Sequence, residues 1–171
     1  MKNKKNIVLI GMPAVGKSTI GILLAKAVGY NFIDTDILIQ SGEKKTLAEI
    51  IKDIGIKQFL ILEQDYLLSV NCREHVIATG GSAVYSVKSM EHLADNGVVI
   101  YLEIGLDDLK KRLSALDSRG VIRTPGQDIT GLYRERTPLY DKFADIRIEC
   151  NCMTPDEVLS KILNALKDKG I

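Results

Sequence analysis

Eight consecutive residues near the amino terminus have the composition of a phosphate-binding loop. Residues 11–18 read Gly-Met-Pro-Ala-Val-Gly-Lys-Ser and match the pattern G-x-x-x-x-G-K-[ST]. In such a loop glycines let backbone N–H groups surround phosphate oxygens, and the helix that follows adds its positive end. Lys17 is expected to contact the β and γ phosphates, and the Ser18 hydroxyl to bind Mg²⁺. The residues expected to contact the nucleotide are Gly11, Ala14, Val15, Gly16, Lys17, Ser18 and Thr19.

Two carboxylates, Asp34 and Asp36, follow the next apolar segment, 31–33. Ligands of open α/β sheets gather at the carboxyl ends of the strands. On extended backbone the two aspartates share a face, so both can point toward one cavity. One carboxylate can hold magnesium or its water, and the other can accept a proton from an attacking hydroxyl. The alternative is that the segment caps the following helix.

A glycine turn and a group of arginines complete the candidate site. The sequence Thr-Gly-Gly-Ser at 79–82 follows another apolar segment, and its missing side chains allow a ligand to approach the backbone. An ordinary turn would look similar. Guanidinium forks suit phosphate and carboxylate, although a solvated helix face is the alternative for any single arginine. The arginines in question are Arg112, Arg119, Arg123, Arg134 and Arg136.

Short apolar runs alternate with longer segments of helical periodicity, which predicts an α/β fold with a parallel sheet. The expected strands are 6–10, 31–33, 76–78, 98–102 and 146–149. The expected helices are 17–28, 46–53, 58–71, 87–95, 106–116, 129–143 and 154–167. Thr154 and Pro155 are a start signal for the last helix. The polar stretch 117–128 is expected to be a mobile lid.

Length and composition favour a single domain, 1–171, that acts on a small molecule. Lys and Arg number 23 against 22 Asp and Glu, without a dense basic run, so neither a nucleic-acid groove nor a membrane-binding face is expected. No membrane-length or signal segment is visible, which favours a cytoplasmic protein, expected as a monomer. The three cysteines, Cys72, Cys150 and Cys152, lack disulfide or metal-ligand spacing and are expected to be free thiols.

Four ordered motifs resemble the shikimate kinase family through nearly the whole chain. They are GMPAVGKSTIG, FIDTD, TGG, and LYRERTPLY followed by Ala144-Asp145. The resemblance implies a P-loop NTPase-type three-layer fold, with a five-stranded parallel sheet of order 2-3-1-4-5 flanked by helices and a closing lid. It also implies transfer of the γ-phosphate of ATP to the 3-hydroxyl of shikimate.

The resemblance also implies roles for individual residues. Asp34 would assist magnesium, and Asp36 would hold and deprotonate the acceptor hydroxyl. Gly80 and Gly81 would line the acceptor site, and Arg136 would pair with the shikimate carboxylate. In the same way, the lid arginine near the transferring phosphate would be Arg119, and the arginine that stacks on adenine would be Arg112.

The chain departs from the family pattern mainly on the acceptor side. Leu60 replaces an arginine expected to bind the acceptor carboxylate, which removes a charge-assisted contact of about 1.5–3 kcal/mol. Ser82 replaces the third glycine of the turn, and Gly120 replaces a lid proline. The leading hypothesis is therefore phosphorylation of shikimate, and the second is the same chemistry on another small alcohol or hydroxy amino acid. A nucleotide-binding regulatory module without efficient transfer is the third.

Overall fold

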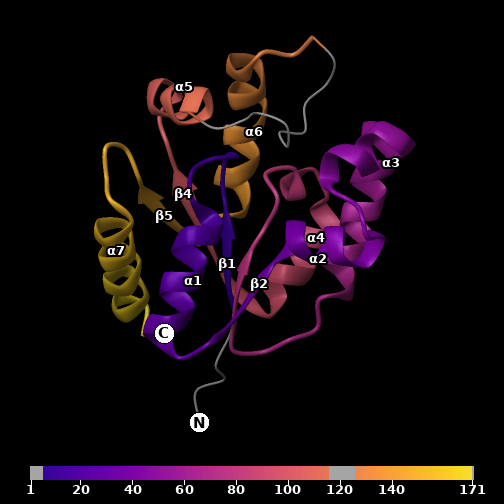
Figure 1. Cartoon of the computed structure of the whole chain (residues 1–171). Helices are drawn as coiled ribbons and strands as arrows, with labels where there is room; N and C mark the ends of the chain where they lie inside the picture. The colour runs from indigo at the N-terminus through magenta and orange to yellow at the C-terminus, as the bar shows by residue number, and fades with distance from the viewer. Residues whose placement is uncertain (1–5, 116–125, 171) are drawn as a thin grey trace.

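Five short strands form the centre of the molecule in a computed structural model that describes residues 6–115 and 126–170 (Figure 1). All four strand pairings are parallel, and the order is β2-β3-β1-β4-β5, as the sequence predicted. Every residue of β1 is buried, as is usual where helices cover both faces of a parallel sheet. The strands are β1 (Asn6–Ile10), β2 (Asn31–Asp34), β3 (His75–Ala78), β4 (Gly97–Glu103) and β5 (Ile146–Glu149).

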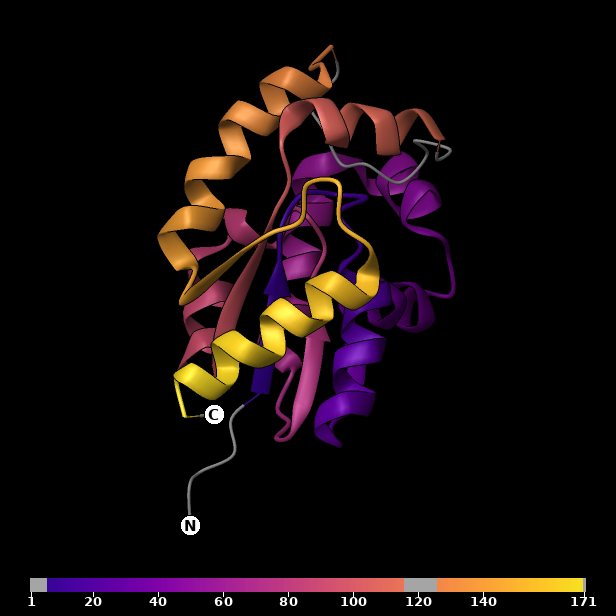
Figure 2. The same cartoon turned by 90° about the vertical axis from the view of Figure 1, so that its left-hand side faces the viewer.

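Helices cover both faces of this sheet. Figure 2 shows α1 and α6 on opposite sides of it, with α7 alongside the sheet. The α-helices are α1 (Lys17–Val28), α2 (Thr35–Glu43), α3 (Leu47–Ser69), α4 (Val87–Asp95), α5 (Leu106–Ala115), α6 (Ile129–Phe143) and α7 (Pro155–Asp168), and a 3₁₀ turn, η1, spans Ala83–Tyr85. Among the described residues, no helix combines the length and apolar character needed to cross a membrane.

The structure differs from the sequence-based expectation in the segment between β2 and β3. The helix α2 was not predicted, because its nine residues carry a glycine and only a short apolar stripe. The two helices expected at 46–53 and 58–71 form one element, α3, interrupted at Gly55, which has φ 78° and ψ 161°. The start of α7 is confirmed, since Thr154 and Glu157 form a capping box.

Parallel pairing brings three segments to one edge of the sheet. In the register, Asp34 lies opposite Ala78, and Ala78 lies opposite Leu9. The strands β1, β2 and β3 therefore end side by side, and the P-loop (residues 11–18), α2 and the turn at 79–82 begin there. Most of the predicted lid, with Arg119 and Arg123, lies outside the described residues.

Candidate active site

The P-loop adopts backbone conformations that favour glycine. Gly11 has φ 144° and Gly16 has φ 103°, while Ala14 has φ 64°. A Cβ atom on Gly11 would lie 2.6 Å from the carbonyl oxygen of Leu102, so a larger residue would collide with β4. The loop therefore turns tightly and leads directly into the N-terminus of α1, where unpaired backbone N–H groups can meet an anion.

Lys17 is the buried cation of the loop. Its Nζ donates hydrogen bonds to the carbonyl oxygens of Gly11 and Met12, at 2.8 and 2.9 Å, and the residue is only 8% exposed. Burial lowers the pKa of Lys17 to about 8, and the nearby carboxylate of Asp36 partly opposes this shift. An incoming phosphate would add negative charge beside Lys17 and so favour its protonated form.

Asp34 joins the P-loop to α2. Its Oδ2 accepts a hydrogen bond from the Ser18 hydroxyl at 2.5 Å, while its Oδ1 accepts from the backbone N–H groups of Asp36 and Ile37, at 3.0 and 3.3 Å. Asp34 is thus the N-cap of α2, which was the alternative interpretation of this segment. Oδ2 faces the P-loop while Oδ1 caps the helix, so one side chain makes both contacts.

Asp36 lies in the first turn of α2 rather than on a strand. The expectation that Asp34 and Asp36 share a strand face was therefore wrong, because the helix begins at Thr35. Burial raises the pKa of Asp36, and the charge of Lys17 opposes this shift. Among the described residues, its buried Oδ1 has no hydrogen-bond partner. An unpartnered carboxylate oxygen on a cavity wall is suited to accept a hydrogen bond or proton from a ligand.

Glu63 is a second buried carboxylate that the sequence-based site did not include. It is 2% exposed, and its Oε1 accepts a hydrogen bond of 2.9 Å from the Ser82 hydroxyl. Burial is the main cause that raises the pKa of Glu63 to about 7; the charge of Asp36 acts in the same direction, and Ser82 and Arg136 oppose the shift. Its burial could have been predicted from its spacing in the sequence. Glu63 lies four residues after Phe59 and four before Leu67, so the three side chains share the buried face of α3.

Gly80 leaves space for both carboxylates. A Cβ atom there would lie 2.6 Å from Glu63 Oε1 and 2.7 Å from Asp36 Oδ1. The two oxygens therefore converge on one methyl-sized space, and no side chain fits between them. The backbone N–H of Gly80 donates to the buried hydroxyl of Thr35 at 3.1 Å, which fixes the turn against α2.

Arg136 supplies a buried positive charge on the other side of the turn. It lies in α6 and is 1% exposed, in contrast to the solvated helix face that was the alternative for any single arginine. A Cβ atom on Gly81 would lie 3.0 Å from its Nη1. Its Nε donates a hydrogen bond of 3.1 Å to the hydroxyl of Tyr85. A buried guanidinium at a cavity wall is suited to an anionic ligand.

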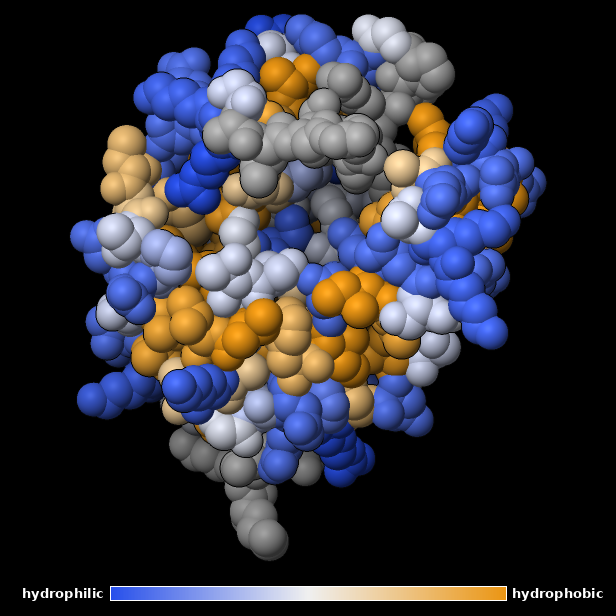
Figure 3. All heavy atoms as spheres, in the orientation of Figure 1, coloured by the Kyte–Doolittle hydropathy of each residue, from blue (hydrophilic) through white to orange (hydrophobic). Residues whose placement is uncertain are grey.

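Lys17, Asp36 and Arg136 face one cavity of about 240 Å³. Figure 3 shows the surface hollowed at the centre of the face that it draws, close to this part of the structure. The P-loop, Asp36, the turn at 79–82 and Arg136 line the cavity, and so does Leu47. It thus joins the predicted phosphate side to the predicted acceptor side. Leu60 is half-buried on α3 and is not among the residues that line it.

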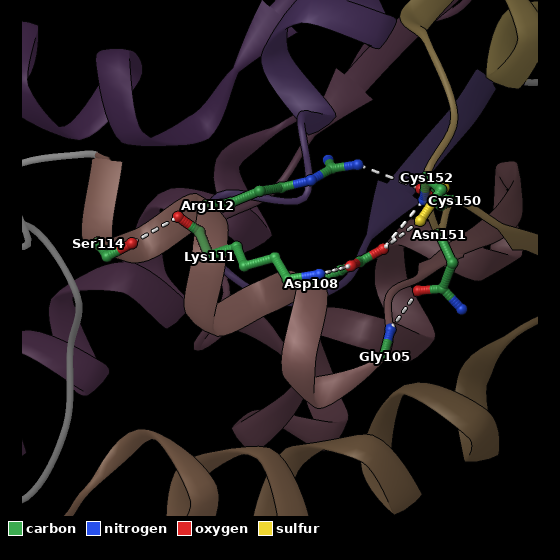
Figure 4. Close-up of polar contacts among 8 residues, drawn as sticks. All are labelled: Gly105, Asp108, Lys111, Arg112, Ser114, Cys150, Asn151 and Cys152. Carbon is green, nitrogen blue, oxygen red and sulfur yellow. Dashed lines mark hydrogen bonds and ion pairs between the residues drawn. The ribbon is translucent and has the colours of Figure 1, made fainter.

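Arg112 lies outside this cavity and connects two loops. Its guanidinium donates to the carbonyl oxygens of Val15 in the P-loop and Cys150 after β5, at 3.0 and 3.1 Å. Figure 4 shows Arg112 extending from α5 toward the segment of Cys150 and Cys152, where Asp108 accepts from the backbone N–H of Cys152 at 2.9 Å. The predicted stacking on adenine stays a prediction. The three cysteines are free thiols, as expected.

Comparison with known proteins agrees with this arrangement. A family model for shikimate kinase matches residues 13–167. The shikimate kinase of Nostoc sp. strain PCC 7120 is 36% identical over 165 residues, covering 94% of this chain and 90% of the relative. The structure of shikimate kinase from Acinetobacter baumannii in complex with shikimate has a TM-score of 0.87 at 29% identity, covering 98% of this chain and 96% of that chain. The shikimate kinase structure from Aquifex aeolicus has a TM-score of 0.82 at 30% identity, covering 97% and 98%. The chain therefore belongs to the shikimate kinase family.

Proposed function

We propose that this small-molecule kinase transfers the γ-phosphate of ATP to the 3-hydroxyl of shikimate. The observation that carries the proposal is the sharing of one cavity by Lys17, Asp36 and Arg136. These side chains match the three parts of the reaction, because they offer a cation for phosphate, a carboxylate for the hydroxyl and a guanidinium for the substrate carboxylate. The A. baumannii relative, whose structure is described in complex with shikimate, supports this choice of acceptor.

Each of these side chains has one task in the proposed reaction. Lys17 leaves the loop carbonyls to contact the β and γ phosphates and offsets charge that develops during transfer. Asp36 orients the 3-hydroxyl and accepts its proton as the oxygen attacks phosphorus. Arg136 holds the carboxylate and so fixes the ring relative to Asp36. Arg119, outside the described residues, is proposed to stabilise the transferring phosphoryl group.

Mg²⁺ is proposed as the accompanying cation. The Ser18 hydroxyl and Asp34 Oδ2 lie 2.5 Å apart at the P-loop, and both are the oxygen ligands that Mg²⁺ prefers. They therefore fit a site in which Ser18 binds the ion and Asp34 holds it or its water. The ion would neutralise phosphate charge.

The decisive experiment measures ADP release from ATP with Mg²⁺, with and without shikimate, and identifies the product by ³¹P NMR. We expect saturable stimulation by shikimate and formation of a phosphate monoester at the 3-hydroxyl. ATP binding without stimulation by shikimate would refute the proposed acceptor. Lys17→Ala and Asp36→Asn should each reduce kcat by about a hundredfold or more while the purified variants stay folded.

A second candidate is the same transfer to another small alcohol, such as a hydroxy amino acid. Leu60 favours it, because the chain lacks an arginine at that position, and because a second carboxylate, Glu63, meets Asp36 at Gly80. A panel of hydroxylated acids, sugars and hydroxy amino acids tests it. A kcat/KM for any of them above that for shikimate would favour this candidate over the first.

We also propose that the kinase is monomeric and cytoplasmic. Free thiols at all three cysteines are usual in reducing compartments. Light scattering on the purified protein tests the first point, and fractionation of source cells tests the second.

A further inference from the structure

Tyr85, the last residue of η1, contacts Arg136 in two ways. The Arg136 Nε donates a 3.1 Å hydrogen bond to the Tyr85 hydroxyl, and the guanidinium carbon lies 5.0 Å from the centroid of the Tyr85 ring. The second contact is within the range of cation–π attraction. Arg136 is almost wholly buried, so water competes little with either contact.

The hydroxyl of Tyr85 has a defined direction. It donates its proton to Glu135, which also accepts a 2.6 Å hydrogen bond from Gln127. A hydroxyl carries one proton, so donation to Glu135 leaves its lone pairs for Arg136. The bond from Tyr85 holds the pKa of Glu135 below its usual range, while burial and this same bond raise the pKa of Tyr85. Glu135 therefore stays charged and Tyr85 stays protonated, which keeps the direction fixed.

The contact at Nε decides how Arg136 meets a carboxylate. An arginine can use its two terminal nitrogens, or Nε together with one of them. Tyr85 occupies Nε. The Nη1 atom lies next to Gly81, and Gly81 and Arg136 both line the cavity. Nη1 is therefore the terminal nitrogen that lies on the cavity side of Arg136.

We propose that Tyr85 is a positioning residue that orients Arg136 toward the carboxylate of the acceptor and thereby contributes to acceptor selectivity. The inference rests on the proposed function, in which Arg136 binds that carboxylate. Tyr85 is not among the residues that line the cavity, so its effect passes through Arg136. The orientation of Arg136 matters more in this chain because Leu60 supplies no second guanidinium.

Two substitutions at Tyr85 separate its hydroxyl from its ring. Tyr85→Phe keeps the ring, and it should raise the KM for shikimate about threefold to tenfold, the range expected for one hydrogen bond, with kcat and the KM for ATP changed less than about twofold. Tyr85→Leu removes both contacts and should raise the KM further. The matched control is Tyr66→Phe, which removes a hydroxyl that donates to Glu43 at 2.8 Å and should leave all three constants unchanged.

The methyl ester of shikimate distinguishes positioning from general loosening of the site. The ester has no carboxylate charge, so wild type and Tyr85→Phe should have similar kcat/KM values for it. If Tyr85→Phe lowered kcat/KM equally for shikimate and its ester, or left the KM for shikimate unchanged, the role of Tyr85 would be overturned. The proposed function would not be affected by either result. Absence of shikimate turnover by the wild-type enzyme would instead overturn the proposed function, and the inference with it.

Discussion

Leu60 offers a direct test of how this pocket holds an acceptor carboxylate. It is three residues before the buried Glu63 on α3, a spacing at which an arginine can pair with a glutamate. Leu60→Arg should lower the KM for shikimate about tenfold to a hundredfold, because it adds a charge-assisted contact, while the KM for ATP stays unchanged. Steady-state kinetics measure both. Ile61→Arg, at a position that is 52% exposed, is the control, and an equal effect there would contradict the prediction.

Protonation of Glu63 should be linked to folding. Burial raises its pKa from 4.5 to about 7, so between these values the folded state binds more protons than the unfolded state. Glu63 therefore contributes its full stability below pH 4.5, its pKa in the unfolded chain. This contribution is lost as the pH rises through about 7, its pKa in the folded protein. From about pH 5 to about pH 8, wild type should lose about 1–3 kcal/mol of unfolding free energy relative to Glu63→Gln. Urea titrations measure this difference, and parallel pH curves would refute it.

At the scale of one element, Asp34 at the N-terminus of α2 combines the helix cap with the contact to Ser18, for which a role in Mg²⁺ binding is proposed. Asp34→Asn keeps a cap oxygen but loses the charge facing Ser18, so kcat should fall about tenfold or more with little change in stability. Asp34→Ala should lose about 1 kcal/mol of unfolding free energy as well. Activity assays and urea unfolding separate the two effects. Thr154→Ala, which removes the cap of α7, should lose stability without losing kcat.

The interruption of α3 at Gly55 is a backbone feature that can be tested separately from packing. A Cβ atom at Gly55 or at Gly29 would meet nothing within 4 Å, so contacts do not distinguish the two sites. Gly29 has φ 72° and ψ 30°, a left-handed region that other residues reach, whereas ψ 161° at Gly55 restricts that position to glycine. Gly55→Ala should cost about 1–3 kcal/mol, and Gly29→Ala less. Equal losses in urea unfolding would contradict this.

At the scale of the whole molecule, ligand binding should stabilise the fold because the cavity is lined by distant segments of the chain. A non-hydrolysable ATP analogue with Mg²⁺, at a hundred times its Kd, should raise the unfolding free energy by about 2.7 kcal/mol. Thermal unfolding with and without the analogue measures the effect. Chelation of Mg²⁺ should remove most of it, and Lys17→Ala should reduce it at the same analogue concentration. An equal shift for wild type and Lys17→Ala would show that the analogue binds elsewhere.

Local patterns were sufficient to predict most of the fold. β1 is a short buried apolar run and β5 alternates buried and exposed residues, and the expected segments for both strands match the structure. The gap between the two helices expected around 46–71 coincides with Gly55. The helix α2 was missing from the expected helices because its apolar stripe is short, although a helix cap in this segment, which the Oδ1 of Asp34 provides, was the alternative interpretation. A cap of this kind competes with strand extension, and tertiary contacts decide between them.

The sequence by itself determined the phosphate loop, because the glycines, Lys17 and Ser18 that define it lie within eight consecutive residues. It also determined the alternation of strands and helices, because hydrophobic periodicity is local. Only the tertiary structure decided that Asp36, Glu63 and Arg136 surround one turn. Their proximity arises where parallel strands end at one edge and helices from distant parts of the chain close over it. Burial produced there raises the pKa values of both carboxylates and lowers that of Lys17, and burial does not exist until the chain has folded.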